Sequence, residues 1–577
     1  MKHYLKKLGT MLLCASVFLS GCGNTTMISS NTDPTAPAEQ SADAGANAAL
    51  DSDDITFVSD DYKYNHELNI IDDNYRNYYE IFLYSYADSD GEGIGDINGL
   101  IDKLDYINDG DDSTDSDLGF NGIWLMPVMP STTYHKYDVI DYCDIDKEYG
   151  TLSDFKRLVE ECHKRDIRLI IDLVLNHTSS QNKWFVEATD YLKSLADGEK
   201  PNPEECKYVD YYHFVEGDPG KSTYYQVGNT NWYYEAVFWE QMPDLNLADK
   251  ELRKELESIA SFWLDLGVDG FRLDAAKEYY SGSTEKNVEV LNWFCDYVKS
   301  EKEDAYIVAE VWEAFSSMAN YYESGVDSCF NFALSQANGK IATTLNSSST
   351  TNKAKSYAEA MVKIQDTLGG KDPGYIDAPF FVNHDTTRAG AVFANDEDKM
   401  KMAAGMTLMM SGSPFVYYGE EIGMSSMGTK DENKRTPMFW SSENTDYMTK
   451  GPADADRFEN KFPALDVQQM DSNSIYHYYK RAVRIKNENP EIARGTVDVN
   501  EELSGDAVCV IKKTYRESSV TLVYNVTDEN QEVDLKNCTG DDGKLKIYGY
   551  LSVDGKEPVC SEDGKLSMPK YSIVVLR

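Results

Sequence analysis

Three acidic residues stand where a strand-like apolar run ends, and together they could cleave a covalent bond. Asp274 ends the run VDGFRLD, Glu310 follows AYIVA, and Asp385 follows APFFVNH. The ends of parallel strands meet at one edge of a sheet or barrel, so these carboxyl groups can converge on one substrate. Two carboxyl groups flanking a glycosidic bond, one of them able to donate a proton, are what breaking that bond requires.

The residues beside these carboxyl groups suit the same chemistry. Arg272 lies two positions before Asp274, on the same face of a strand, where its charge can keep that carboxylate ionised. Val311 and Trp312 can raise the pKa of Glu310 by excluding water, as a proton donor requires. Taken singly, each segment also allows a purely structural role, as an Asp–Arg pair or as a Glu at a strand end.

Six segments, in this order, resemble the motifs of glycoside hydrolase family 13, the α-amylase family: YHKYDV, DLVLNH, MPDLN, GFRLDAAKE, AEVW and FVNHD. The resemblance extends from about Tyr75 to the C-terminus. It implies Asp274 as the nucleophile, Glu310 as the general acid/base and Asp385 as the stabiliser of the transition state. The substrate contacts that it implies are Tyr137, His177, Arg272, Lys277 and His384.

Other parts of the resemblance imply structure more than chemistry. MPDLN (242–246) is similar to a form intermediate between strict α-amylases and the oligo-1,6-glucosidase group, and Asp244 within it would position a loop. RTPMFW (435–440) marks the fold, and Asp172 has a structural role. The family's amylases commonly have His where this chain has Glu278, which puts in doubt a calcium site between two domains.

The loop DSDGEGIGD (88–96) offers oxygen ligands at alternate positions, as Ca²⁺ favours. It is not an EF-hand, because Gly99 occupies the twelfth position and a strand precedes the loop. A similar loop after the first barrel strand binds calcium in the oligo-1,6-glucosidase-like branch, which implies a structural Ca²⁺ here. A solvated acidic loop is the alternative. The expected ligands are the side chains of Asp88, Asp90, Glu92 and Asp96 and the backbone carbonyl of Ile94.

Apolar runs of strand length alternate with helical patterns along most of the chain. One helical pattern covers residues 155–162, with Ser153 as its expected N-cap, and another covers residues 252–266, which Gly267 can end. Eight buried strands with intervening helices predict an α/β fold, the (β/α)8 TIM barrel. The expected strands are 80–86, 122–128, 168–175, 268–274, 305–311, 327–332, 378–384 and 414–419.

The alternation of strand-like and helical patterns stops after His177, and near Asn487 it gives way to short alternating strands. The first lapse resembles the family's domain B, inserted after strand 3, and the later short alternating strands predict a C-terminal antiparallel β domain. The expected division is a lipoprotein signal peptide (1–22), a disordered tether (23–60), the first part of the catalytic barrel (61–177), domain B (178–246), the second part of the barrel (247–486) and a C-terminal β-sandwich domain (487–577).

The N-terminus predicts export. Lys2, Lys6 and Lys7 precede an apolar stretch, 8–19, that is too short to span a bilayer as a mature anchor. The following Leu-Ser-Gly-Cys resembles the processing signal of bacterial lipoproteins, which implies a lipid on Cys22. A plain cleaved signal peptide is the alternative. The protein is therefore expected on the extracellular face of the membrane, lipid-anchored or secreted.

The charge of the chain argues against anionic partners. With 55 Lys+Arg against 99 Asp+Glu, the formal net charge is −44. Such a field repels nucleic acid and anionic lipid, whereas a neutral sugar is indifferent to it. We expect a monomer that meets a membrane only through its N-terminal anchor.

The resemblance implies a retaining α-glucan hydrolase of the α-amylase type, cleaving α-1,4 bonds in starch or maltooligosaccharides. A 4-α-glucanotransferase and an α-1,6-acting oligoglucosidase or neopullulanase use the same three carboxylates and are the alternatives. A catalytically dead starch-binding lipoprotein is a third alternative. It would be expected to lack at least one of the three carboxylates, and this chain has all of them.

Overall fold

The computed structural model describes residues 62–348, 351–536, 538 and 545–577. The predicted signal peptide, Cys22 and the predicted tether lie outside these residues. Within the described ranges, no helix has the length and apolar character needed to cross a bilayer.

A parallel sheet of seven strands forms the centre of the fold, in the order β10-β1-β2-β3-β7-β8-β9. Two isolated parallel bridges, Phe330 with Ala378 and Phe380 with Phe415, connect its edges and close it into a barrel. The predicted (β/α)8 architecture is thereby confirmed. The strands are β1 (Tyr78–Ile81), β2 (Gly122–Leu125), β3 (Arg168–Leu173), β7 (Gly270–Leu273), β8 (Tyr306–Ala309), β9 (Ser328–Cys329) and β10 (Phe415–Tyr417).

Three of the expected strands differ markedly from the structure. The strand expected at 327–332 is reduced to β9 and an isolated bridge at Phe330. The first strand was expected at 80–86 but ends at Ile81, because the chain turns into a 3-10 helix, η1 (Leu83–Ser85). The expected strand 378–384 contributes only the two bridges. Pro379 within it has no N–H to donate, so a continuous hydrogen-bonded ladder cannot run through this segment.

Alternate residues of the barrel strands fill the barrel interior. Tyr78 stacks on Phe415 at a centroid distance of 4.7 Å and on Tyr306 at 5.2 Å. Since side chains alternate along a strand, the inward face continues two residues further on, from Tyr78 to Glu80. On β3, likewise, Asp172 lies two residues after the inward-facing Ile170 and so shares its face of the strand. Polar side chains therefore gather where the strands end. The interior cluster comprises Tyr78, Trp124, Ile170, Tyr306, Val308, Phe330, Ile376, Ala378, Phe380 and Phe415.

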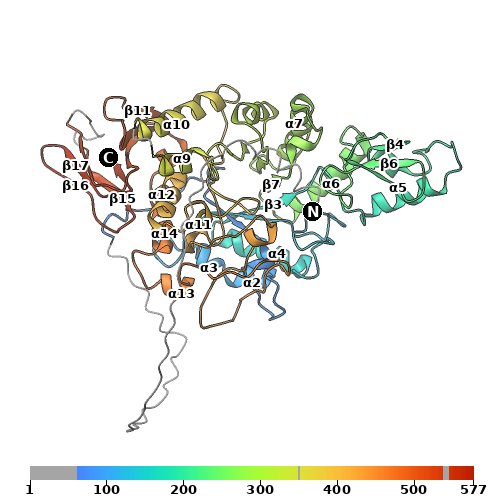
Figure 1. The fold of residues 1–577 in the computed structure, drawn as a ribbon, viewed down its shortest axis with the longest axis horizontal. Helices are drawn as coiled ribbons and strands as arrows, with labels where there is room; N and C mark the ends of the chain where they lie inside the picture. Colours follow the sequence, from blue (N-terminus) through green and yellow to red (C-terminus); the bar gives the residue numbers. More distant parts are fainter. Residues whose placement is uncertain (1–61, 349–350, 537, 539–544) are drawn as a thin grey trace, which may run out of the picture. The chain divides into compact units, whose positions relative to one another are not determined.

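Apolar side chains of the barrel helices pack in one core with those of the strands. Figure 1 shows how these helices and strands are arranged. Helix α4 begins after Thr151, which forms a capping box with Asp154, so the expected cap Ser153 is wrong by two residues. Helix α6 ends at Asp265, and Gly267 follows with a φ of 101°, as predicted. The helices are α2 (Ile97–Asp102), α3 (Leu104–Ile107), α4 (Leu152–Lys164), α6 (Lys250–Asp265), α7 (Thr284–Glu301), α8 (Phe315–Met318), α9 (Lys340–Asn346), α10 (Lys353–Gly369), α11 (Ala389–Val392), α12 (Glu397–Leu408), α13 (Leu465–Gln468), α14 (Ile475–Glu488) and α15 (Pro490–Arg494).

Between β3 and α6 the chain forms a small sheet of its own. Its three antiparallel strands have the order β4-β6-β5. Bridges of His177 with Asp244 and of Tyr212 with Leu245 bring the two ends of this excursion together. Its elements are α5 (Lys183–Ser194), η2 (Lys207–Asp210), β4 (Phe214–Glu216), β5 (Tyr224–Gln226) and β6 (Trp232–Glu235).

Two antiparallel sheets, with orders β11-β12-β13-β18-β15 and β14-β17-β16, follow the barrel. Both contribute to one apolar cluster, which contains Val523 from the first sheet and Val533 and Leu566 from the second. The expected boundary at 486–487 falls inside α14, and the first strand starts only at Thr496. The strands are β11 (Thr496–Val499), β12 (Val508–Tyr515), β13 (Ser518–Asn525), β14 (Gln531–Asp534), β15 (Ile547–Ser552), β16 (Val559–Cys560), β17 (Lys565–Met568) and β18 (Ser572–Leu576).

Candidate active site

Arg272, fully buried on β7, lies at the centre of the predicted site. Its Nη1 donates to Asp172 Oδ1 and to Asp274 Oδ1, each at 2.7 Å. Its Nη2 donates to Glu310 Oε2, also at 2.7 Å. Leaving a buried charge unpaired costs several kcal/mol, so this guanidinium is what permits three acidic groups to share a dry site. The structure therefore brings Arg272, Asp274 and Glu310 together.

Glu310 has the protonation behaviour of an acid/base group. Burial raises its pKa to about 7, against the lowering effect of Arg272. The backbone N–H of Ala275, a residue with a left-handed φ of 47°, donates to Glu310 Oε2 at 3.1 Å. Of its two apolar neighbours, Val311 is buried and Trp312 is 39% exposed. A carboxyl group with a pKa near neutrality can both give and take a proton.

His384 and Asp385 form a second polar group across the site. The His384 ring is 2.6 Å from Glu80 Oε1 at Nδ1 and 3.0 Å from Asp385 Oδ2 at Nε2. Burial lowers the pKa of this imidazole, but Asp385 and Glu80 outweigh burial and raise the pKa to about 9. Conversely, His384 and Arg435 outweigh burial at Asp385 and hold its pKa well below the ordinary value. These shifts favour an imidazolium beside a carboxylate at neutral pH.

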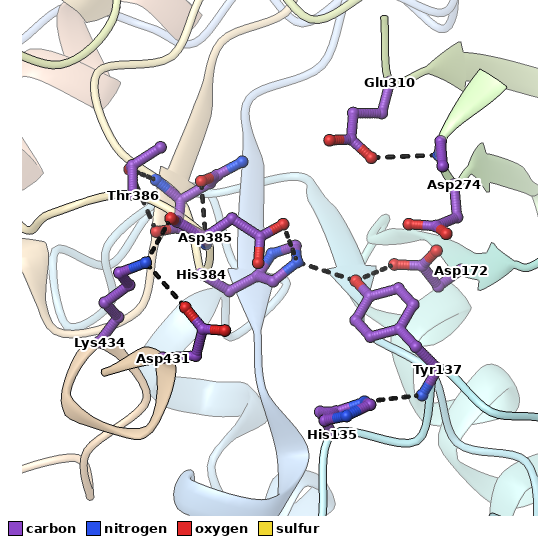
Figure 2. A network of polar contacts seen from close by, with 12 residues as sticks. His135, Tyr137, Asp172, Asp274, Glu310, His384, Asp385, Thr386, Asp431 and Lys434 are labelled. Atoms are coloured by element: carbon purple, nitrogen blue, oxygen red, sulfur yellow. Dashed lines mark hydrogen bonds and ion pairs between the residues drawn. The ribbon is translucent and has the colours of Figure 1, made fainter. Parts of the chain in front are cut away.

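Tyr137 connects the two groups. Its hydroxyl donates to Asp172 Oδ2 at 3.0 Å and lies 2.9 Å from His384 Nε2. Figure 2 shows Glu310 and Asp274 on one side and Asp385 on the other, with their carboxyl groups directed toward the region between them. The three carboxyl groups are thus placed so that they could act on one bond held there, as the predicted nucleophile, proton donor and stabiliser would have to do.

The remaining predicted substrate contacts, His177 and Lys277, differ in their surroundings. His177 is buried, and its Nε2 has no hydrogen-bond partner among the residues that the structure describes. Burial lowers the pKa of this imidazole, which favours the neutral ring, and the unpartnered Nε2 could meet a sugar hydroxyl. Lys277, on η3 (Ala276–Glu278), is partly exposed and lies 3.5 Å from Glu278, outside the network.

Two residues at the site were not singled out for chemistry by the sequence. Arg435, in the segment expected only to mark the fold, donates from Nη2 to Asp385 Oδ1 at 2.8 Å and from Nε to the His384 carbonyl at 3.2 Å. Glu80, at the end of β1, accepts from His384. The sequence did offer a reason to single out Glu80, because it is an acidic residue in an apolar run and lies two residues after Tyr78, on the same face of the strand. No local signal pairs Arg435 with Asp385.

The predicted calcium loop gathers three of its four acidic side chains. Asp88, Asp90 and Asp96 each contribute a carboxylate oxygen to a group whose atoms all lie within 4.8 Å of one another. These oxygens suit a hard cation such as Ca²⁺. Glu92 is exposed and lies outside this group, and Lys450 Nζ donates to its backbone carbonyl at 2.9 Å.

Comparison with known proteins agrees with this geometry. The family model described as the α-amylase catalytic domain matches residues 80–495. Alpha-amylase 3 of Dictyoglomus thermophilum is 34% identical over 507 residues, which cover 87% of this chain and 93% of that protein. An oligo-1,6-glucosidase of Parageobacillus thermoglucosidasius is 30% identical over 73% of this chain and 84% of its own length. The solved structure of Eubacterium rectale Amy13B superimposes with a TM-score of 0.84 at 44% identity, covering 89% of this chain and 97% of that one.

Proposed function

The chain belongs to the α-amylase family of glycoside hydrolases, and on this premise we propose that it is a retaining hydrolase of α-1,4 bonds in starch or maltooligosaccharides. The observation that carries the proposal is the Arg272 guanidinium, which contacts both Asp274 and Glu310 at 2.7 Å. The two carboxyl groups must lie close together, because one guanidinium donates to both of them. Closely spaced carboxyl groups are typical of retaining enzymes, in which one carboxylate attacks the sugar directly. In inverting enzymes the carboxyl groups lie farther apart and leave room for a water molecule between them.

The reaction proceeds in two displacements. Asp274 attacks the anomeric carbon while Glu310, protonated near neutral pH, gives its proton to the leaving oxygen. Glu310 then takes a proton from a water molecule whose oxygen attacks the anomeric carbon, which breaks the bond to Asp274 and releases the sugar with retained configuration. Asp385 stays ionised throughout and stabilises the positive charge that develops on the sugar ring.

The test compares the purified protein with the variant Asp274→Asn on maltoheptaose, starch and pullulan. Separating the products by chain length and anomeric form should give shorter α-anomeric products from the parent and none from the variant. A β-anomeric product would contradict a retaining mechanism on α-glucan.

The same experiment separates the alternatives. Pullulan cleavage would indicate tolerance of α-1,6-containing substrates, which relatives named as oligo-1,6-glucosidases make a relevant alternative. Products longer than maltoheptaose would indicate a 4-α-glucanotransferase. Glucan binding without any reaction would indicate a binding protein.

We further propose that the loop 88–96 holds a structural Ca²⁺ through Asp88, Asp90 and Asp96. The convergence of their carboxylates supports the proposal. Calorimetry should detect Ca²⁺ binding in the parent and its loss in Asp90→Asn, and chelator should lower the melting temperature of the parent. Glu92→Gln is the matched control, since Glu92 lies outside the group. Equal loss of binding in both variants would return Glu92 to the ligand set, and no binding in the parent would remove the site.

For the N-terminus we propose a lipid anchor on Cys22, as the Leu-Ser-Gly-Cys sequence suggests. In a bacterial host, Cys22→Ala should move the protein from the membrane fraction to the medium or prevent its processing. An unchanged distribution together with unchanged processing would leave a plain secretion signal as the explanation.

A further inference from the structure

Glu80 is a buried acid that touches the site through one side chain. It lies on β1 with 1% of its surface exposed, and its Oε1 is 2.6 Å from His384 Nδ1 and 3.3 Å from the His384 backbone nitrogen. Its Oε2 has no hydrogen-bond partner among the described residues. Burying an acid with one oxygen unpaired is costly, so the contact with His384 must compensate for much of that cost.

Acceptors face both nitrogens of the His384 ring. Glu80 lies at Nδ1, and Asp385 and the Tyr137 hydroxyl lie at Nε2. Tyr137 uses its own proton toward Asp172 Oδ2, so it can accept from His384. A neutral imidazole has one N–H, and only the imidazolium donates on both sides. The contacts therefore select the doubly protonated ring.

We propose that Glu80 is a positioning residue that keeps His384 protonated on both nitrogens, so that Nε2–H remains a donor to Asp385 and to the hydroxyl of a bound sugar. Glu80 acts through His384 and never meets the substrate. The consequence for catalysis rests on the proposed glucan hydrolysis, whereas the protonation of His384 does not depend on it.

The charges around His384 show why Glu80 is needed. Besides Glu80 and Asp385, the ring is close to Asp172 through Tyr137, and Arg435 Nε donates to the His384 carbonyl at 3.2 Å. Arg435 also pairs with Asp385 and so offsets part of the charge that favours the imidazolium. Without Glu80, Nδ1 would face a buried environment with no acceptor and no negative charge, which favours the neutral ring.

Glu80→Gln tests this inference because it keeps the shape and a hydrogen-bond acceptor but removes the charge. The direct readout is the NMR titration of the His384 ring, assigned by comparison with His384→Gln. We expect the pKa of His384 to fall by at least about one unit, a tenfold loss of proton affinity. We expect kcat on maltoheptaose to fall about 10- to 100-fold, less than for deletion of a direct transition-state donor, with a smaller change in KM.

Glu421→Gln is the matched control. Glu421 is a second fully buried glutamate, and it accepts from Tyr79 and Tyr106 at 2.6 and 2.8 Å without touching His384. Its removal should leave the His384 titration and kcat as in the parent, whatever it does to the melting temperature. A merely structural Glu80 would behave like Glu421.

The outcomes are separable. A His384 titration unchanged in Glu80→Gln, or a parent His384 that is neutral at neutral pH, overturns the inference. If Glu80→Gln does not fold, the His384 titration is compared in the parent and in Glu80→Asp. Asp keeps the negative charge, so the inference predicts a protonated His384 ring in both proteins. If the parent cleaves no glucan, the proposed function fails, while the titration still confirms or overturns the role of Glu80.

Discussion

Glu310 and Asp385 are both carboxyl groups at the ends of barrel segments, yet their surroundings shift their pKa values in opposite directions. Burial dominates at Glu310, where Arg272 is shared with Asp172 and Asp274, and the pKa rises to about 7. At Asp385 the cations His384 and Arg435 prevail, and the pKa falls well below its ordinary value. Divergent environments of this kind assign one group as the acid and the other as a permanent anion.

The first prediction concerns the alkaline limb of activity. The proton donor must be protonated in the free enzyme, so kcat/KM should fall as the pH rises through about 7, the pKa of Glu310. The measurement is kcat/KM on maltoheptaose from about pH 5 to about pH 9, with the melting temperature followed over the same range as a control. A rate that stays constant to the alkaline end of this range, in a folded protein, would contradict the assignment.

The second prediction concerns Arg435. Arg435→Met removes the 2.8 Å contact with Asp385, leaves that carboxylate freer to move and should lower kcat about 10- to 100-fold. The control is Arg457→Met, an exposed arginine in the same irregular segment, which should leave kcat unchanged. If kcat were the same in the two variants, Arg435 would have no role in catalysis.

Between elements, Lys513 connects the C-terminal strands to the barrel. It lies on β12, fully buried, and donates to the carbonyls of Met409 and Ile492 at 2.9 and 2.7 Å and to Ser411 Oγ at 3.1 Å. Burial lowers its pKa to about 7. The unfolded chain therefore binds more protons at this lysine than the folded protein does above that pH.

The third prediction follows from these contacts. Lys513→Met leaves buried acceptors unsatisfied and should lower the free energy of unfolding by about 3 kcal/mol, measured as a shift of the urea midpoint. The folded-state pKa of Lys513 lies below the unfolded value, so the contribution of Lys513 to stability rises with pH. The difference in the free energy of unfolding between parent and variant should therefore increase from about pH 7 to about pH 9.

The control for this prediction is the neighbouring residue on the same strand. Lys512 is exposed, so Lys512→Met should change the free energy of unfolding by less than about 0.5 kcal/mol. Equal shifts in the two variants, or a gap that narrows as the pH rises, would contradict the role of Lys513.

For the molecule as a whole, the net charge of −44 is a matter of stability and solubility. Like charges on one surface repel one another, and salt screens that repulsion over about 10 Å at 0.1 M. A neutral glucan neither gains nor loses by this field.

The fourth prediction separates the effect of charge on stability from its effect on substrate binding. Raising NaCl from about 0.02 M to about 0.5 M should raise the melting temperature, because self-repulsion is screened. The KM for maltoheptaose should stay the same within error. A KM that depends strongly on salt would indicate a charged substrate and would count against a neutral glucan.

The sequence by itself determined the strand-and-helix alternation, the closed barrel and the positions of the acidic residues at the ends of its segments. These features are local, since a period of two and an apolar run select a strand and its inward face. Even here, Pro379 reduced one expected strand to two bridges, and the N-cap of helix α4 is Thr151, which forms a capping box with Asp154, and not the expected Ser153.

The contact of Arg272 with Asp274 was expected from their spacing, but only the tertiary structure decided which distant partners the ionisable groups meet. Arg435 reaches Asp385 across 50 residues of chain, and Glu80 reaches His384 across 304. The pKa values, and with them the chemistry, depend on such long-range contacts and on burial, which change with distance in space and not with spacing along the chain. The sequence could therefore name the acidic residues and lead us to expect the proton on Glu310, but only the fold supplies the burial and the partners that set each pKa.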